Sequence, residues 1–149
     1  MGAKRIVEFG SSFGVSTLYL AAAAKDTGGR VIGTEMEASK AERARANLEE
    51  AGLADIAEIR VGDALETLKD LDGRVDLLFL DGWKDLYVPI ARMMEPKLRP
   101  GALLLADNLH TFPAELEAYL DYTGSPDGPY ASVTLPFESG LGYALYSGD

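Results

Sequence analysis

Cysteine is absent from this 149-residue sequence, which also has a single histidine and a single tryptophan. The lack of cysteine excludes disulfide bonds and thiolate metal sites, and it favours an intracellular protein. Basic residues are scarce, with 14 Lys and Arg against 24 Asp and Glu, for a formal net charge of -10. Surfaces that bind nucleic acids or anionic membranes need clustered basic residues, so neither partner is expected.

Long apolar segments are missing as well. No apolar run is long enough to cross a bilayer, and no signal-peptide pattern follows the first residues, so the expected location is the cytoplasm. The length suits one domain with a substantial core, and no repeat, linker or low-complexity segment divides the sequence. We therefore expect residues 1–149 to form a single domain.

Short apolar segments alternate with helical patterns along most of the sequence. The predicted strands are 5–10, 30–35, 57–62, 75–81 and 102–107, and the predicted helices are 15–25, 39–52, 64–71, 86–98 and 114–122. Ser39 is predicted to cap the second helix, with Glu42 three residues later and Gly52 as the stop signal. Two last strands, within 130–136 and 140–147, are predicted to form an antiparallel hairpin. This order predicts an α/β fold with a doubly wound, mostly parallel, seven-stranded Rossmann-like sheet and functional loops at the carboxyl ends of its strands.

A glycine-rich segment, VEFGSSFGVST, joins the first predicted strand to the first helix. Gly10 and Gly14 are four residues apart, with Glu8 before them, Ser12 between them and Ser16 after them. This is not the G-x-G-x-x-G spacing of dinucleotide-binding folds. Glycine lets the main chain approach a ligand closely, and the first turn of a helix offers N–H groups to a carboxylate. A tight turn without any ligand explains the glycines equally well.

Acidic residues follow the second and third predicted strands. Glu35 stands where a carboxylate accepts hydrogen bonds from both ribose hydroxyls in nucleotide-binding α/β folds, and a solvated strand end is its alternative role. Asp63 stands where an acid reaches an adenine amino group, and an N-cap for the next helix is an equal alternative.

Together these segments resemble class I S-adenosylmethionine (SAM) methyltransferases, and in particular their catechol O-methyltransferase-like branch. The resemblance rests on VEFGSSFGVSTLYLA, VIGTEME, VGDALETL, DGWKDLYVPI and GALLLADN, in this order and spacing, and it covers residues 5–108. It implies O-methylation of a small phenolic acceptor with two adjacent hydroxyls. It also implies a SAM site formed by Glu8, Gly10, Ser12, Gly14, Ser16, Glu35, Met36, Asp63, Asp81 and Trp83.

The resemblance further implies a metal site at two neighbouring strands, the fourth and the fifth. The fourth strand ends at Asp81, and the fifth ends at Asp107 and Asn108. Because adjacent strands lie about 4.8 Å apart, three oxygen-bearing side chains converge there. Oxygen ligands suit Mg²⁺ rather than a soft metal, and His110 is expected to be a loop residue instead of a ligand.

Lys84, three residues after Asp81, is predicted to accept the proton of the acceptor hydroxyl, with Asp81 and Asn108 as the other catalytic residues. Burial and a neighbouring cation both lower the pKa of a lysine from its ordinary value of about 10.4. The alternative for Lys84 is an exposed side chain paired with Asp85. Trp83 offers a flat face to adenine, to the sulfonium or to the substrate ring, and packing against the next helix is its alternative. Packing is also the alternative for Met36.

Two features depart from the resemblance. The sequence enters its first predicted strand at Arg5, whereas the family has helices before that strand, and Gly82 stands where relatives carry a larger side chain. The alternative function is therefore a SAM-binding module with little or no catalysis. An NAD-dependent oxidoreductase is a third hypothesis, which the spacing of the glycines disfavours. Self-association through the fifth strand or the closing hairpin is left open.

Overall fold

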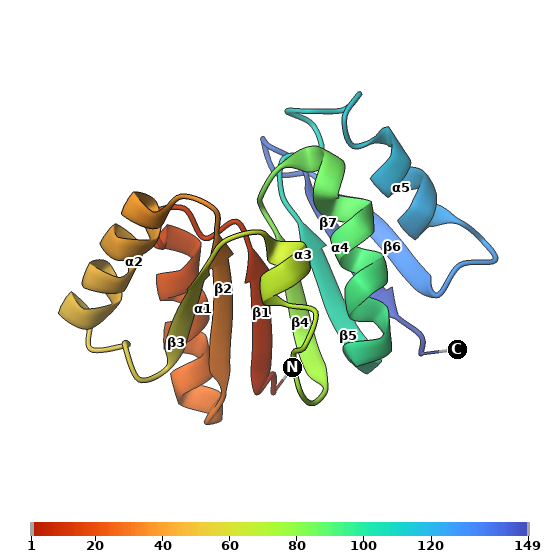
Figure 1. Cartoon of the computed structure of the whole chain (residues 1–149). Helices are drawn as coiled ribbons and strands as arrows, with labels where there is room; N and C mark the ends of the chain where they lie inside the picture. Colours follow the sequence, from red (N-terminus) through yellow and green to blue (C-terminus); the bar gives the residue numbers. More distant parts are fainter. Residues whose placement is uncertain (1, 149) are drawn as a thin grey trace.

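The computed structural model describes residues 2–148, and its strands form one seven-stranded sheet in the order β3-β2-β1-β4-β5-β7-β6 (Figure 1). The strands are β1 (Arg5–Phe9), β2 (Arg30–Glu35), β3 (Ala57–Val61), β4 (Val75–Leu80), β5 (Leu98–Ala106), β6 (Tyr130–Leu135) and β7 (Leu141–Tyr146). Strands β1 to β5 pair in parallel, and β7 pairs antiparallel with both β5 and β6. The predicted mostly parallel sheet with a closing hairpin is confirmed.

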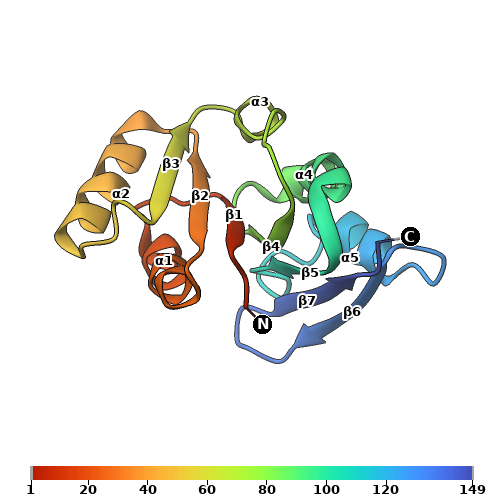
Figure 2. The same cartoon turned by 90° about the horizontal axis from the view of Figure 1, so that it is seen from below.

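Helices cover the two faces of the sheet at different places. The helices are α1 (Val15–Thr27), α2 (Ala38–Glu50), α3 (Ala64–Thr67), α4 (Tyr87–Met94) and α5 (Glu117–Gly124), with 3₁₀ turns η1 (Lys84–Leu86) and η2 (Glu95–Lys97) beside α4. Figure 2 shows α1 and α2 on one face, beside β1 to β3, and α3, α4 and α5 on the other. Two apolar cores result, one on each face.

Successive residues of the central strands alternate between these two cores. On β1, Ile6 packs with the core under α1 and α2, and Val7 packs with the core under α4 and α5. On β4, Leu77 and Leu78 divide in the same way. Burial on both faces explains why these strands are continuous apolar runs in the sequence.

The α1 side of β6 and β7 is covered by no helix among residues 2–148 (Figure 2). Tyr143 pairs with Leu105 of β5, which packs with the α1-side core, so Tyr143 faces the same side. Val133, Tyr143 and Leu145 are 59%, 40% and 45% exposed. The edge strand at this end of the sheet is β6, and β5 lies between β4 and β7. Self-association stays a prediction, but the fifth strand offers no free edge for it.

Several predicted helix ends are wrong. Helix α2 begins at Ala38 with Glu37 at its N-cap position, and no side chain caps it. Ser39 is therefore inside the first turn, and the predicted capping role is wrong. Glu35 Oε1 accepts the Glu37 N–H instead, at 2.9 Å. The side chain that holds this turn thus comes from the preceding strand rather than from the helix.

Other differences lie around α3, α4 and α5. Helix α3 ends at Thr67, short of the predicted residue 71, and α5 begins at Glu117 rather than at residue 114. The predicted helix 86–98 is divided because Pro96, in η2, cannot donate a backbone hydrogen bond to an α-helix. Residues 99–101, which lie between the predicted helix 86–98 and the predicted strand 102–107, are part of β5, where the pairing is irregular between the Val75–Leu98 and Leu77–Leu103 pairs. No helix of the described chain has both the length and the apolarity needed to span a membrane.

Asp76 joins three strands at the amino end of the sheet. Its Oδ2 accepts the backbone N–H groups of Lys4 and Arg5, each at 2.8 Å, and its Oδ1 accepts Arg99 Nε–H. Burial alone would raise the pKa of the Asp76 carboxyl, but the hydrogen bonds from Arg5, Arg99 and Lys4 outweigh burial and lower this pKa below its ordinary value of 3.8. The ionised carboxylate therefore stabilises the start of β1.

The substitution Asp76→Asn should lower the free energy of unfolding by about 1–3 kcal/mol at pH 7, because two backbone donors and Arg99 lose a charged acceptor. A carboxyl whose pKa is lower in the folded state stabilises the protein above its unfolded pKa and loses this effect as the pH falls through the folded pKa. In urea unfolding, the gap between wild type and variant should therefore narrow as the pH drops below 3.8. Asp72→Asn, at an exposed site, is the control. A gap independent of pH would contradict the assignment.

Candidate active site

The carboxyl ends of the parallel strands border a cleft of about 230 Å³. Its walls come from the loops that follow β1, β2, β3 and β4. The lining residues are Phe9, Gly10, Ser12, Thr34, Glu35, Met36, Glu37, Lys40, Gly62, Asp63, Ala64, Asp81, Gly82, Trp83 and Leu86. The cleft thus lies at the edge where the sequence predicts the functional loops.

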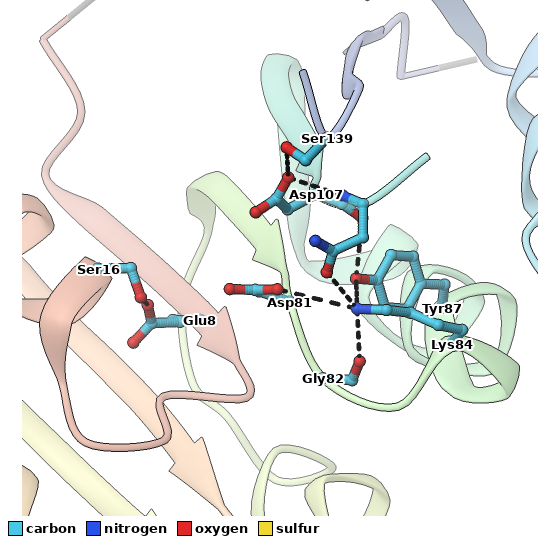
Figure 3. A network of polar contacts seen from close by, with 9 residues as sticks. Glu8, Ser16, Asp81, Gly82, Lys84, Tyr87, Asp107 and Ser139 are labelled. Atoms are coloured by element: carbon cyan, nitrogen blue, oxygen red, sulfur yellow. Dashed lines mark hydrogen bonds and ion pairs between the residues drawn. The ribbon is translucent and has the colours of Figure 1, made fainter. Parts of the chain in front are cut away.

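A buried carboxylate holds the glycine loop from below. Glu8 has no exposed surface, and its two oxygens accept hydrogen bonds from the hydroxyls of Ser11, Ser16 and Thr17. Burial raises the pKa of Glu8, and the three hydroxyl donors oppose this rise. Glu8 and Ser16 are therefore hydrogen-bond partners of each other (Figure 3), and neither lines the cleft.

The loop after β1 touches the loop after β4 through main-chain atoms. Gly10 has φ +90°, and a Cβ on it would lie 2.5 Å from the Gly82 Cα and 2.7 Å from the Asp81 carbonyl carbon. No side chain fits in that space, so residue 10 must be glycine. Gly82 is confined in turn, because a Cβ on it would lie 2.5 Å from two ring atoms of Phe9. The large Phe9 ring explains why this chain has no side chain at position 82.

Two acidic side chains of the cleft also have structural partners. Glu35 Oε2 accepts the Ser12 N–H at 2.8 Å and so joins the glycine loop to the end of β2. Asp63 Oδ1 accepts the Leu65 N–H at 2.9 Å, which confirms its alternative role as the cap of α3. Both carboxylates still line the cleft.

Trp83 and Met36 lie at the mouth of the cleft. The two side chains are 68% and 49% exposed. The alternative in which Trp83 packs beneath the next helix is therefore wrong. Exposed apolar side chains that line a cleft are available to a flat ligand.

A lysine ammonium lies at the centre of a second group of side chains, next to the cleft (Figure 3). Lys84 Nζ donates hydrogen bonds to Asn108 Oδ1 at 2.7 Å, to Tyr87 Oη at 2.8 Å and to the Gly82 carbonyl at 3.0 Å. Asp81 Oδ1 lies 3.8 Å from the same nitrogen. The Lys84 side chain is only 13% exposed and pairs with Asp81, so the alternative of an exposed lysine paired with Asp85 is wrong.

The electrostatic balance of this group is set by burial and by two carboxylates. Burial, together with the negative charge of Asp107, raises the pKa of Asp81 to about 6, and the Lys84 ammonium partly offsets this rise. Burial lowers the pKa of Lys84, while Asp81 and Asp107 oppose this shift. The direction expected for Lys84 from partial burial is confirmed.

Asp107 is held by groups from its own loop and from the closing hairpin. Its Oδ1 accepts the Asn108 N–H at 2.6 Å and the Ser139 hydroxyl at 2.7 Å. Asn108 has φ +70°, a left-handed conformation that Asn adopts more readily than most residues. His110 lies exposed in the loop that follows, as predicted, and its N–H bonds to the Ser139 carbonyl.

The structure brings together most of the predicted site residues. Seven of the predicted SAM-site residues line the cleft, namely Gly10, Ser12, Glu35, Met36, Asp63, Asp81 and Trp83, whereas Glu8, Gly14 and Ser16 lie outside its lining. Sequence reasoning missed Tyr87 as a partner of Lys84 and Ser139 as a partner of Asp107. The spacing of three residues between Lys84 and Tyr87 was a usable signal, but nothing local in the sequence connects Ser139 to Asp107.

Solved structures that superpose on this chain include methyltransferases, which indicates the class. Cofactor-bound Rv0187 from MTB superposes with a TM-score of 0.87 at 31% identity, over 98% of this chain and 74% of that chain. An O-methyltransferase from Bacillus cereus in complex with S-adenosylhomocysteine (SAH) gives a TM-score of 0.85 at 26% identity, over 97% and 74%. The fold is thus that of a Rossmann-like methyltransferase.

The family described as "Methyltransferase domain" matches residues 7–109, and this chain belongs to it. The chain is 41% identical over 108 residues to a catechol O-methyltransferase of Mycobacterium tuberculosis, covering 72% of this chain and 49% of that protein. It is 35% identical over 111 residues to a catechol O-methyltransferase of Niastella koreensis, covering 72% and 50%. The chain thus spans about half the length of these curated relatives.

The contact between Phe9 and Gly82 can be tested by a double-mutant cycle. Gly82→Ala should destabilise the wild type, because the new methyl group meets the Phe9 ring at 2.5 Å. In a Phe9→Ala background the ring is gone, so the same substitution should cost less by about 0.5–3 kcal/mol, the usual range for residues in contact. The free energies come from urea unfolding.

Gly124→Ala is the matched control, because no heavy atom lies within 4 Å of a Cβ at that position. Its effect should be the same in both backgrounds. If Gly82→Ala costs the same with and without the Phe9 ring, steric exclusion by Phe9 is not what requires glycine there.

Proposed function

We propose that this protein transfers a methyl group from SAM to a hydroxyl of a small phenol with two adjacent hydroxyls, assisted by a divalent cation such as Mg²⁺. The observation that carries the proposal is the position of Asp81. This residue lines the cleft proposed for SAM, and it also faces Lys84. A donor in the cleft and an acceptor at Lys84 would therefore meet across one side chain.

Binding of SAM is assigned to the cleft and its acidic residues. Glu35 holds the glycine loop through Ser12, and each carboxylate oxygen has lone pairs left for the ribose hydroxyls. Asp63 caps α3 through Oδ1, which leaves Oδ2 for the adenine amino group. Trp83 and Met36 at the mouth provide apolar contact with the nucleoside. Support comes from the relatives above whose structures are described as cofactor-bound or SAH-bound.

The side chains proposed for the cation fit a hard metal ion. Asp81, Asp107 and Asn108 offer two carboxylates and one amide oxygen, the donor types that Mg²⁺ binds. Within residues 2–148 no group of three His, Cys, Asp or Glu side chains could hold a metal, and this set depends on the amide of Asn108. Asn108 Oδ1 bonds to Lys84 Nζ, so a cation on that oxygen would share or replace this hydrogen bond.

In the proposed mechanism, the neutral amine form of Lys84, which burial favours by lowering its pKa, accepts the proton of the acceptor hydroxyl. Mg²⁺, when bound, supplies positive charge that makes a nearby hydroxyl more acidic. The acceptor oxygen then forms a bond to the methyl carbon while the bond from that carbon to sulfur breaks, and SAH is left. Tyr87 and the Gly82 carbonyl hold the lysine nitrogen at the seam between the two sites. Such positioning of aligned reactants contributes roughly 7–11 kcal/mol in favourable cases.

A SAM-binding module without methyl transfer is the second candidate. The observation that favours it is the open mouth of the cleft, where Trp83 and Met36 are 68% and 49% exposed. Exposure to water weakens the electrostatic interactions on which transfer depends. Tight SAM binding with no transfer to any phenol would select this candidate.

Binding of SAM is tested by isothermal titration calorimetry on wild type and on Glu35→Gln. The variant should bind SAM about tenfold more weakly, equivalent to about 1.4 kcal/mol, because an amide offers one acceptor oxygen where the carboxylate offers two. Glu58→Gln, at an exposed position of β3, is the control and should bind like wild type. Thermal stabilisation of the protein by NADH, but not by SAM, would instead support an oxidoreductase.

Methyl transfer is tested with labelled SAM and 4-methylcatechol. EDTA should abolish turnover and added Mg²⁺ should restore it, and Asp107→Ala should reduce kcat/KM by about 10²–10⁴-fold, since it removes one proposed ligand. Lys84→Met should lower kcat and change KM much less, because it removes the proton acceptor and keeps the apolar part of the side chain. Asp70→Asn, at an exposed site, serves as the control. Turnover that is indifferent to EDTA, or a fully active Asp107→Ala protein, would refute the metal role.

A further inference from the structure

The tip of the closing hairpin, between β6 and β7, lies against the loop that follows β5. The Leu109 N–H donates a hydrogen bond to the Gly140 carbonyl at 3.0 Å, and the His110 N–H donates one to the Ser139 carbonyl at 2.8 Å. Gly140 has φ +73°, and a Cβ on it would lie 2.6 Å from the His110 Cγ. Main-chain hydrogen bonds and close packing therefore fix the tip, and with it Ser139, beside Asp107.

Two donors occupy one oxygen of the Asp107 carboxylate. Oδ1 accepts the Ser139 hydroxyl at 2.7 Å and the Asn108 N–H at 2.6 Å, whereas Oδ2 accepts no hydrogen bond within residues 2–148. Figure 3 shows one carboxylate oxygen turned toward Ser139 and the other turned away from it. Donors on one oxygen restrict the rotation of a carboxylate, so Oδ2 is left free in a defined direction.

Like-charge repulsion acts on the same carboxylate. Burial is the main cause that raises the pKa of Asp81, and the negative charge of Asp107 adds to this rise. The two carboxylates therefore repel each other, and Asp107 has no ion-pair partner in the described part of the chain. Rotation of the Asp107 side chain would relieve the repulsion, and the bonds from Ser139 and Asn108 oppose this rotation.

We infer that Ser139 is a positioning residue for the divalent cation, because its hydroxyl holds the Asp107 carboxylate with Oδ2 free to bind the ion. The inference rests on the proposed function, which places the cation at Asp81, Asp107 and Asn108. Loss of a hydrogen-bond partner of a metal ligand typically costs about 10–100-fold in metal affinity. The Asn108 N–H still restrains Oδ1 when the Ser139 hydroxyl is removed, so a loss near the lower end, about tenfold, is expected.

A purely structural role is the alternative for Ser139. In that case its hydroxyl only helps to attach the hairpin tip, and its removal lowers stability without changing the affinity for a cation. The two roles can be separated, because the main-chain bonds of Leu109 and His110 do not involve the Ser139 side chain. The tip should therefore stay attached in Ser139→Ala while the Asp107 carboxylate becomes free to rotate.

The test measures cation binding directly, with Mn²⁺ as the probe and without any acceptor. Mn²⁺ prefers oxygen ligands as Mg²⁺ does, and its free form is measured by electron paramagnetic resonance with SAH present. Ser139→Ala should raise the Kd for Mn²⁺ about tenfold, and Ser139→Thr, which keeps a hydroxyl, should restore most of the affinity. Asp107→Ala should lose this binding, which locates the ion. The affinity for SAH should stay within about twofold of wild type in Ser139→Ala, since Ser139 does not line the cleft.

The matched control is Ser132→Ala, in β6 of the same hairpin. The Ser132 hydroxyl donates to the Thr123 carbonyl at 2.9 Å, so this variant also loses one hydrogen bond, but none to a proposed ligand of the ion. Both alanine variants should lower the midpoint of urea unfolding, and only Ser139→Ala should bind Mn²⁺ more weakly. An unchanged Mn²⁺ affinity in Ser139→Ala, or an equal loss in Ser132→Ala, would overturn the inference.

The inference and the proposed function fail in different ways. If wild type and Ser139→Ala bind Mn²⁺ equally and both transfer methyl groups, the role of Ser139 is wrong and the proposed function stands. If Mn²⁺ binding depends on Ser139 but no methyl group reaches 4-methylcatechol, the proposed function is wrong and the inference stands. If wild type binds no Mn²⁺, the proposed role of the cation and the inference are both wrong.

Discussion

The contact between Gly10 and the Asp81–Gly82 main chain is the constraint on which the rest of the site depends. It exists because β1 and β4 are neighbours in the sheet, so the loops that leave them meet at the same edge. No Cβ fits at residue 10, and the Phe9 ring excludes one at residue 82. The Asp81 N–H also donates a hydrogen bond to the Phe9 carbonyl at 2.8 Å, so main-chain contacts join the glycine loop to the turn that carries Lys84. In the proposed function, this contact sets the distance between donor and acceptor.

The carboxylates on the two sides of this contact, Glu8 and Asp81, differ in how far their charge is compensated. Under the glycine loop, the Glu8 carboxylate is buried but satisfied by three hydroxyls, so it serves the architecture. On the other side, Asp81 has Lys84 at 3.8 Å and accepts no hydrogen bond within residues 2–148. A partly buried carboxylate whose charge is only partly compensated raises the energy of the site unless a further cation binds. Because of this difference, the proposed catalytic roles are given to Asp81 and its neighbours rather than to Glu8.

The strands of the sheet could be predicted from the sequence because strands that are buried on both faces have continuous apolar sequences. The expectation that Asp81, Asp107 and Asn108 lie at the ends of neighbouring strands came instead from the resemblance to SAM methyltransferases, and β4 and β5 are neighbours in the sheet. Helix ends were harder to predict, because they depend on groups outside the helix. Ser39 looks like a cap, but the turn is held by Glu35 from β2.

Parts of the site depend on packing that the sequence does not display. Glu8 was predicted as a ligand contact, but the first strand carries it under the loop, where the hydroxyls of Ser11 and Thr17 enclose it with Ser16. The role of Ser139 arises only when the closing hairpin folds back beside β5. In the sequence, Gly82 is only a departure from the family. The structure gives its reason, because the Phe9 ring occupies the space that a side chain at residue 82 would need. Each of these contacts joins segments that only the tertiary fold brings together.

The most direct test of the account is a crystal structure of the protein with SAM, Mg²⁺ and 4-methylcatechol. The account predicts the ribose hydroxyls at Glu35, the ion bound by Asp81, Asp107 and Asn108, and Lys84 Nζ within hydrogen-bond distance of a catechol oxygen. An ion elsewhere, or SAM bound outside the cleft with the three side chains pointing away from one another, would contradict it.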